Sequence, residues 1–330
     1  MTDNIVRDLF ASHREPAWHG LGTVFDHEVT DSREMLALAG LDNWNVRSAD
    51  IAPVTEEGQP IDARFIQNMK AIMGTVAGEE VVLGVTGERY EIIQNEDAFS
   101  FLQTLHDGAR WETAGAIKGG RVVFGSMAFD RDFILDETGV ADKVNSYLLV
   151  HTSHDGSTGL AGGITPVRVV CQNTLNVAKK GMKQSFKMRH TATVEARMKA
   201  EAEMWRQANT YMDAFEEQAR TLFETPATDK EFFSIVEEMF PRPEVDIKGS
   251  LTKWENKMST FTQAWKGEPN AGIKNTAWGV FNALTEGNQW GRNVRNTENG
   301  SENFFSAGAG FDIPTNKFRQ DALSASLSLV

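Results

Sequence analysis

The sequence has few of the features that mark membrane-spanning, secreted or metal-binding proteins. Its 330 residues include one cysteine, Cys171, so an internal disulfide and a zinc site built from several cysteines are both excluded. No apolar run approaches the roughly 20 residues that a transmembrane helix needs, and the N-terminus lacks the charged and then apolar pattern of a secretory signal. We therefore expect a cytoplasmic protein without a membrane partner.

Sequence motifs of the common nucleotide-dependent and hydrolytic enzymes are missing as well. The chain contains no Gly-x-x-x-x-Gly-Lys-Ser/Thr phosphate loop, no Rossmann glycine fingerprint that opens a helix, and no Gly-x-Ser-x-Gly elbow. These absences argue against an ATPase, a dehydrogenase and an α/β-hydrolase. We expect no cofactor, assign no catalytic residue, and favour a function other than catalysis.

The charge of the chain is negative overall but positive over one short stretch. There are 33 Lys and Arg residues against 46 Asp and Glu residues, which gives a net charge of −13. Residues 166–199 hold 8 basic residues and 1 acidic residue (+7), so the rest holds 25 basic and 45 acidic residues (−20). This asymmetry is typical of a strip that binds a polyanion. The alternative is a solvated helix face that pairs with acidic neighbours.

Patterns of apolar residues predict a mixed α+β fold with a central antiparallel sheet, packed helices, one long helix and a helical C-terminal half. We expect an α+β core domain with an N-terminal cap over residues 1–190 and a mainly helical region over residues 191–330. Strands are predicted at Val81–Val85, Tyr90–Ile93, Arg121–Phe129, Ser146–Ser153 and about Gly159–Val170. Helices are predicted after Asp31, from Asn95, near Asn173, at about 191–224, 229–240, 250–266 and 275–287, and after Pro314.

The predicted long helix at 191–224 carries apolar residues at alternating spacings of three and four. Such a series indicates either an ordinary helix packed on the core or a seam between subunits. The series consists of Trp205, Ala208, Met212, Phe215, Ala219 and Leu222.

Eight residues of the basic stretch are candidates for binding nucleic acid. We expect Asn173 and Thr174 to begin a helix, whose first N–H groups would attract a phosphate. Basic side chains before and after them would extend the contact along a nucleic-acid backbone, and the four glycines between residues 156 and 163 would let the ligand approach closely. The candidates are Arg168, Asn173, Thr174, Lys179, Lys180, Lys183, Lys187 and Arg189.

Three other groups of residues have a chemical and a structural interpretation. His151, His154 and Asp155 could ligate a metal or supply a general base, but a turn-stabilising Asp with two solvent-facing histidines is the favoured interpretation. Cys171 fits a small buried apolar residue better than a nucleophile. Aromatic side chains could stack on bases, although most of them have core-like spacing and only the last of the series is expected to be exposed in a loop. They are Trp18, Trp111, Trp278, Phe281 and Trp290.

Several segments together resemble the phage/plasmid-like protein family, whose domain has no assigned function. The resemblance rests on PAWHGLG at 16–22, YEIIQNEDAF at 90–99, GGRVVF at 119–124, HTSHDGSTGLAGGITPVRVVCQNTL at 151–175, RHT at 189–191 and NTAWGVFNALTE at 275–286. It implies a role in phage or plasmid DNA metabolism in the host cytoplasm, and it carries over no catalytic residue.

The leading hypothesis is therefore ATP-independent binding of single-stranded DNA, or annealing in recombination, by a homo-oligomer. A sheet and helix with a basic edge are similar to the core of phage single-strand annealing proteins, although a shared fold does not establish function. One alternative is a metal-dependent hydrolase or nuclease that uses His151, His154 and Asp155. The other is a phage structural protein or one that interacts with a host protein.

Overall fold

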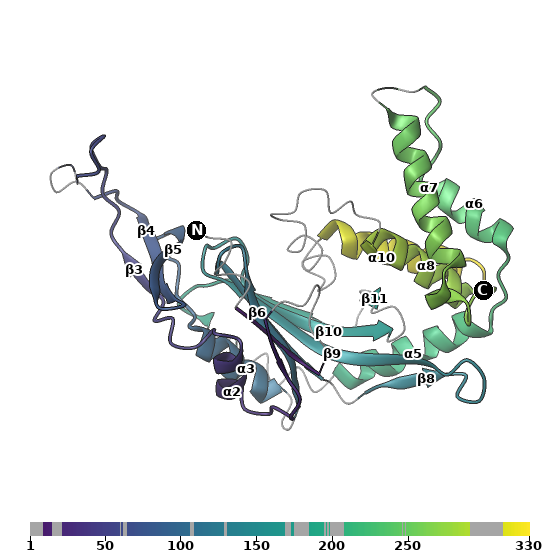
Figure 1. Cartoon of the computed structure of the whole chain (residues 1–330), viewed down its shortest axis with the longest axis horizontal. Coiled ribbons are helices and arrows are strands. Elements are labelled where there is room, and N and C mark those ends of the chain that lie inside the picture. Colours follow the sequence, from purple (N-terminus) through teal and green to yellow (C-terminus); the bar gives the residue numbers. More distant parts are fainter. Residues whose placement is uncertain are drawn as a thin grey trace. The chain divides into compact units, whose positions relative to one another are not determined.

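The computed structural model describes most of the chain, and these residues form a mixed α+β fold (Figure 1). Within them lie a nine-stranded sheet, a three-stranded sheet and seven α-helices. The predicted fold class, with a central antiparallel sheet and a helical C-terminal half, is confirmed. The described residues are 9–14, 22–59, 61, 65–105, 109–128, 131–168, 173–174, 185–194, 196, 198, 208–245, 247, 249–290 and 313–330.

The larger sheet is mostly antiparallel. Its strand order is β11-β10-β9-β7-β6-β1-β2, while β12 also pairs with β10 and β8 also pairs with β9. The pairing of β1 with β2 is parallel. The strands are β1 (Phe10–His13), β2 (Thr23–Phe25), β6 (Trp111–Ile117), β7 (Val122–Ala128), β8 (Phe133–Leu135), β9 (Asp142–Ser153), β10 (Leu160–Arg168), β11 (Asn173–Thr174) and β12 (Ser185–Met188).

The smaller sheet has the order β3-β4-β5 and is antiparallel throughout. It consists of β3 (Arg47–Ala49), β4 (Met69–Val76) and β5 (Glu79–Gly87). Ala77 and Gly78 join β4 to β5 with φ angles of 51° and 83°, and two positive φ angles give a two-residue turn the twist that suits a hairpin. The strand predicted at Val81–Val85 is confirmed as part of β5, whereas Tyr90–Ile93 form a loop and not the predicted strand.

Most predicted helices are confirmed near their predicted boundaries. Asp31 caps the first of them, because its side chain accepts a hydrogen bond from the Arg33 N–H. Within the predicted long helix, residues 194, 196 and 198 are helical and α5 is described from residue 208. The Met212, Phe215 and Leu222 side chains of α5 are buried within the chain, as expected of a packed helix. The helices are α2 (Ser32–Leu38), α3 (Asn95–Leu105), α5 (Ala208–Glu224), α6 (Asp229–Met239), α7 (Ser250–Lys266), α8 (Ala277–Trp290) and α10 (Ile313–Leu327).

The chain divides into two compact units, and β9 and β10 contribute residues to both. The first unit comprises Met1–Phe129, Leu148–Gly163 and Ser185–Gln207, and the second comprises Asp130–Tyr147, Ile164–Gln184 and Ala208–Val330. The domain boundary at residue 190 stays a prediction.

Each unit has its own aromatic core. In the first, the rings of Phe99 and Trp111 stack with centroids 4.9 Å apart, and in the second the rings of Phe232 and Trp265 stack at 4.5 Å. Trp111, like Trp278 and Phe281 of the second unit, is fully buried, so these three candidates for base stacking are core residues. Trp18 lies outside the described residues, and Trp290 ends α8 instead of lying in the predicted loop.

None of the helices in the described part of the chain is long and apolar enough to span a bilayer.

Candidate functional site

Among the described residues of the basic stretch, Ser185–Met188 form strand β12, which pairs with β10 at the edge of the larger sheet. Leu160 pairs with Met188, and Gly163 pairs with Ser185. The strand forms because β10 supplies partners for its backbone hydrogen-bonding groups.

Side chains along β12 alternate between a buried and an exposed face. Phe186 and Met188 are buried, and the Phe186 ring meets the edge of the Phe101 ring at a centroid distance of 5.6 Å. Lys187 and Arg189 are exposed. Lys187 belongs to β12, and Arg189 is the first residue after the strand, where the alternation of buried and exposed residues continues.

The predicted helix start at Asn173 is wrong. Asn173 and Thr174 form strand β11, in which Asn173 pairs with Arg168 and Thr174 pairs with Val167 of β10. Pairing with β10 makes these two residues part of a strand, and the residues after Thr174, over which the helix was predicted, lie outside the described residues. Lys179, Lys180, Lys183 and Cys171 lie outside the described residues.

The glycines of β10 and its preceding turn accommodate protein backbone. A Cβ atom on Gly159 would lie 2.0 Å from the Met188 carbonyl oxygen, and one on Gly162 would lie 2.7 Å from the Leu149 carbonyl oxygen. These glycines let neighbouring strands approach, which is the role that a hairpin requires of them.

The two histidines predicted to face solvent are buried. His154 has no exposed surface and His151 is 9% exposed, because β9 and the turn after it pack inside the first unit. Asp155 does stabilise the turn as predicted, since its carboxylate accepts a hydrogen bond of 2.8 Å from the Ser157 N–H.

His154 is held by Asn95 of α3. The Asn95 Nδ2 atom donates to the Leu41 carbonyl at 2.8 Å, which leaves its Oδ1 atom to accept from His154 Nε2 at 2.9 Å. Although α3 begins at Asn95, the Asn95 side chain binds His154 and does not cap the helix. With Nε2 protonated, the neutral ring keeps a bare Nδ1, for which the described residues provide no hydrogen-bond partner.

A second buried group joins His190 to the loop before α3. His190 Nδ1 donates to the Glu91 carbonyl at 3.0 Å, so its Nε2 accepts from the Thr152 hydroxyl at 3.0 Å. The Tyr90 ring stacks on the imidazole at 4.8 Å, and the Tyr90 hydroxyl donates to the Ser153 carbonyl at 2.6 Å. We call Tyr90, Asn95, Thr152, His154 and His190 the polar network.

Burial strongly favours the neutral form of these histidines over the protonated form. It lowers the pKa of His154 to about 4, with a smaller contribution from His190. It lowers the pKa of His151 to about 3, to which the nearby Lys187 charge adds. The pKa of His190 is lowered by burial too, and burial raises the pKa of Tyr90. All four groups are therefore neutral at pH 7.

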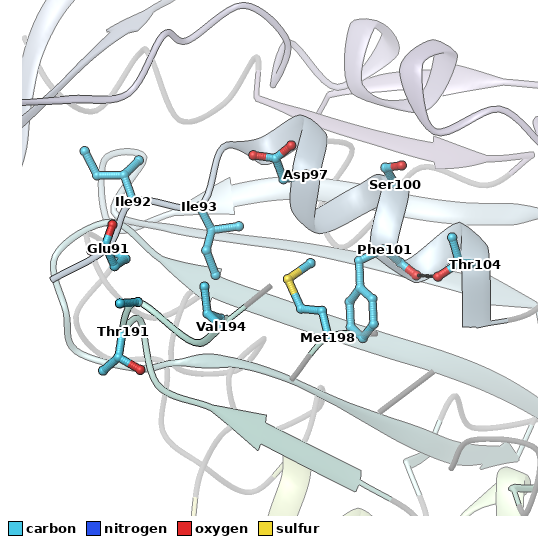
Figure 2. Close-up of a pocket in the computed structure, with 11 residues that line it drawn as sticks. Glu91, Ile92, Ile93, Asp97, Ser100, Phe101, Thr104, Thr191, Val194 and Met198 are labelled. Carbon is cyan, nitrogen blue, oxygen red and sulfur yellow. Dashed lines mark hydrogen bonds between the residues drawn. The ribbon is translucent and has the colours of Figure 1, made fainter. Parts of the chain in front are cut away.

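A pocket of about 620 Å³ opens beside the network, between α3 and the segment that follows β12 (Figure 2). Ile93, Phe101, Val194 and Met198 form its apolar wall, with their side chains directed toward one another. The exposed polar side chains at its rim are those of Glu91, Asp97, Ser100 and Thr104.

Within the described part of the chain, no three His, Cys, Asp or Glu side chains are arranged to hold a metal ion. His151, His154 and Asp155 therefore do not form the metal centre that the hydrolase alternative requires.

One family model, that of a domain of unknown function (DUF932), matches residues 82–306, which is more than half of the chain. The chain belongs to the DUF932 family. No curated protein and no solved structure matches it. The whole polar network and strand β12 lie inside the DUF932 region, whereas β1 to β4 precede it.

Sequence reasoning missed most of the polar network of this DUF932 protein. Its members come from positions 90 to 190, and no local pattern connects a tyrosine, an asparagine and two histidines that are so far apart. The available signal was the segments that carry the family resemblance. YEIIQNEDAF, HTSHDG and RHT supply all five members, and GGRVVF supplies the Arg121 carbonyl that accepts from the His154 N–H at 2.8 Å.

Proposed function

We propose that this DUF932 protein binds single-stranded nucleic acid without ATP and anneals strands during phage or plasmid recombination. The observation that carries the proposal is a pair of exposed basic residues at a sheet edge, Lys187 in β12 and Arg189 directly after this strand. The resemblance to phage and plasmid proteins supports the same role.

The spacing on this strand suits a phosphate backbone. Residues two apart in an extended segment are separated by about 7 Å, which is close to the distance between successive phosphates of an extended single strand. Arg168 and Asn173, paired across β10 and β11, belong to the same basic stretch of the sequence. Lys179, Lys180 and Lys183 would add further phosphate contacts.

The overall charge of −13 makes such binding local and sensitive to salt. Contacts would be confined to the +7 stretch, because the rest of the chain repels a polyanion. Each phosphate contact to a single strand contributes about 0.7 to the slope of log K against log salt concentration.

The test is fluorescence anisotropy with a labelled single-stranded oligonucleotide at several salt concentrations. The variant Lys187→Glu/Arg189→Glu should bind more weakly, and its salt slope should fall by about 1.4, which corresponds to two lost contacts. A second variant with Lys179, Lys180 and Lys183 changed to Glu should reduce the slope further.

A matched control separates local contacts from net charge. Lys253→Glu/Lys230→Glu places the same charge change on exposed positions of α7 and α6. This control should retain at least half of the wild-type affinity. Absence of binding by the wild type at low salt, or equal weakening by the control, would refute the proposal.

A further inference from the structure

The smaller sheet has one face packed inside the first unit. Leu83 of β5 lies against Gly74 of β4 and beside the Trp44 ring near Gly120, and Ile72 is 1% exposed. A Cβ atom on Gly84 would lie 2.5 Å from the Asp155 Cα, so the turn after β9 covers this face closely.

The other face of this sheet is apolar, although it faces outward. Ala71 pairs with Val85 and Met73 pairs with Val82, and cross-strand partners lie on the same face. Val82 is 57% exposed and Val85 is 50% exposed, with Met69 at 38% on the same side of β4. An antiparallel sheet that only faces water carries polar residues at these positions. We call Ala49, Met69, Ala71, Met73, Val82 and Val85 the outer face.

Exposed apolar side chains are concentrated in this region of the chain. Twelve large apolar residues of the described chain are exposed, and seven of them lie between residues 54 and 85. Besides those of the outer face, the segment between β3 and β4 exposes Val54, Phe65 and Ile66 at 58%, 58% and 49%. Together the seven residues expose on the order of 600 Å² of apolar surface, which is at the upper limit for an apolar patch on a monomer.

The charged groups on the outer face neutralise each other. Arg47 stands on β3 beside Met73, Glu80 stands on β5 beside Thr75, and their side chains form an ion pair. The face is therefore uncharged on a chain with a net charge of −13. It neither selects a partner of opposite charge nor repels another copy of itself.

We propose that the outer face of the β3-β4-β5 sheet is the docking surface for a second copy of this chain. The two sheets pack face to face about a two-fold axis, so that each outer face buries its own equivalent. With the exposed apolar residues of the segment between β3 and β4 included, the area is on the order of 600 Å² per partner. This is near the lower limit for a specific complex, so the dimer is weak, with a dissociation constant in the micromolar range. This interface does not depend on nucleic-acid binding, and either proposal can fail without the other.

The test is sedimentation velocity of the full chain over loading concentrations from about 1 to about 200 µM. The mass of the wild type should rise from the monomer value of 36.6 kDa toward twice that value. Val82→Lys/Val85→Lys should raise the dissociation constant at least tenfold. Since both side chains point to solvent, the thermal midpoint of this variant should remain within a few degrees of the wild type.

The control is Val245→Lys/Ile247→Lys, which changes two apolar residues of the second unit that are 66% and 67% exposed and adds the same charge. It should dimerise as the wild type does. A wild type that stays monomeric at the highest concentration overturns the proposal, as does a Val82→Lys/Val85→Lys variant that associates like the control. Binding of a monomeric wild type to lipid vesicles or to another protein through Val82 and Val85 would assign the face to that partner and overturn the proposal too.

Discussion

Acid should destabilise this protein before its carboxylates titrate, because His151 and His154 are buried in the neutral form. In the unfolded chain a histidine has a pKa of about 6.5. In the folded chain the pKa of His154 is about 4 and that of His151 is about 3. Between these values the unfolded state binds protons that the folded state does not bind. Stability is therefore complete above pH 6.5 and is lost as the pH falls toward the folded pKa values.

The size of the loss follows from the shifts. One pH unit in this window corresponds to about 1.36 kcal/mol for each histidine. At pH 5 the loss is about 2 kcal/mol for His154 and about 2 kcal/mol for His151, which makes about 4 kcal/mol together. The structure shows why His154 resists protonation. Its Nε2 already donates to Asn95, and a second proton on Nδ1 would find no acceptor among the described residues. His190 has a lowered pKa and adds a loss of the same sign.

The assay is urea denaturation at pH 7, 6 and 5 at constant ionic strength, for the wild type and for His154→Gln. The glutamine keeps a neutral N–H donor for Asn95 but does not titrate. The variant should lose about 2 kcal/mol less than the wild type between pH 7 and pH 5, whatever its stability at pH 7.

Comparing the two proteins removes contributions that they share. Burial raises the pKa of Glu112, so protonation of that carboxyl stabilises the folded chain as the pH falls and works against the histidines. Its effect is the same in both proteins and cancels in the difference. Equal losses of stability in the wild type and His154→Gln would refute the reasoning, as would a wild type equally stable at pH 7 and pH 5.

Two further predictions concern close packing and a buried hydrogen bond. Gly84→Ala should destabilise the protein by about 1–3 kcal/mol in thermal or urea unfolding, because the new Cβ would lie 2.5 Å from the Asp155 Cα. Gly87→Ala near the end of the same strand has free space and should change stability by less than about 1 kcal/mol, and equal effects would contradict the packing. Trp278→Phe should cost about 1–3 kcal/mol, since it removes the Nε1–H that donates to the buried Asp142 carboxylate at 2.9 Å. An unchanged urea midpoint would show that this hydrogen bond contributes nothing.

The helices were predictable because their signals are local. Residues 250–266 carry apolar side chains at helical spacing, and α7 occupies Ser250–Lys266. Asp31 marks the start of α2 as an N-cap should. In both cases the signal for the helix lies in the residues of the helix and its immediate neighbours.

The candidate site was predictable only in part, because strand pairing decided its form. Lys187 and Arg189 were identified from charge alone and are exposed, while their role in binding stays a prediction. Asn173 was assigned to a helix start, but its pairing with Arg168 of β10 made it a strand residue. A strand needs a partner strand from elsewhere in the chain, and the local sequence around residue 173 does not identify that partner.

The sequence by itself determined the α+β class, the positions of most helices and the one basic stretch in an acidic chain, since composition, periodicity and charge are properties of neighbouring residues. Only the tertiary structure decided that His151 and His154 are buried and neutral. It also showed that Asn95 accepts a hydrogen bond from a histidine 59 positions away, and that one face of the small sheet is apolar and exposed. Burial and cross-strand register depend on which distant segments pack together, and the free energy that stabilises this packing comes from contacts throughout the folded chain.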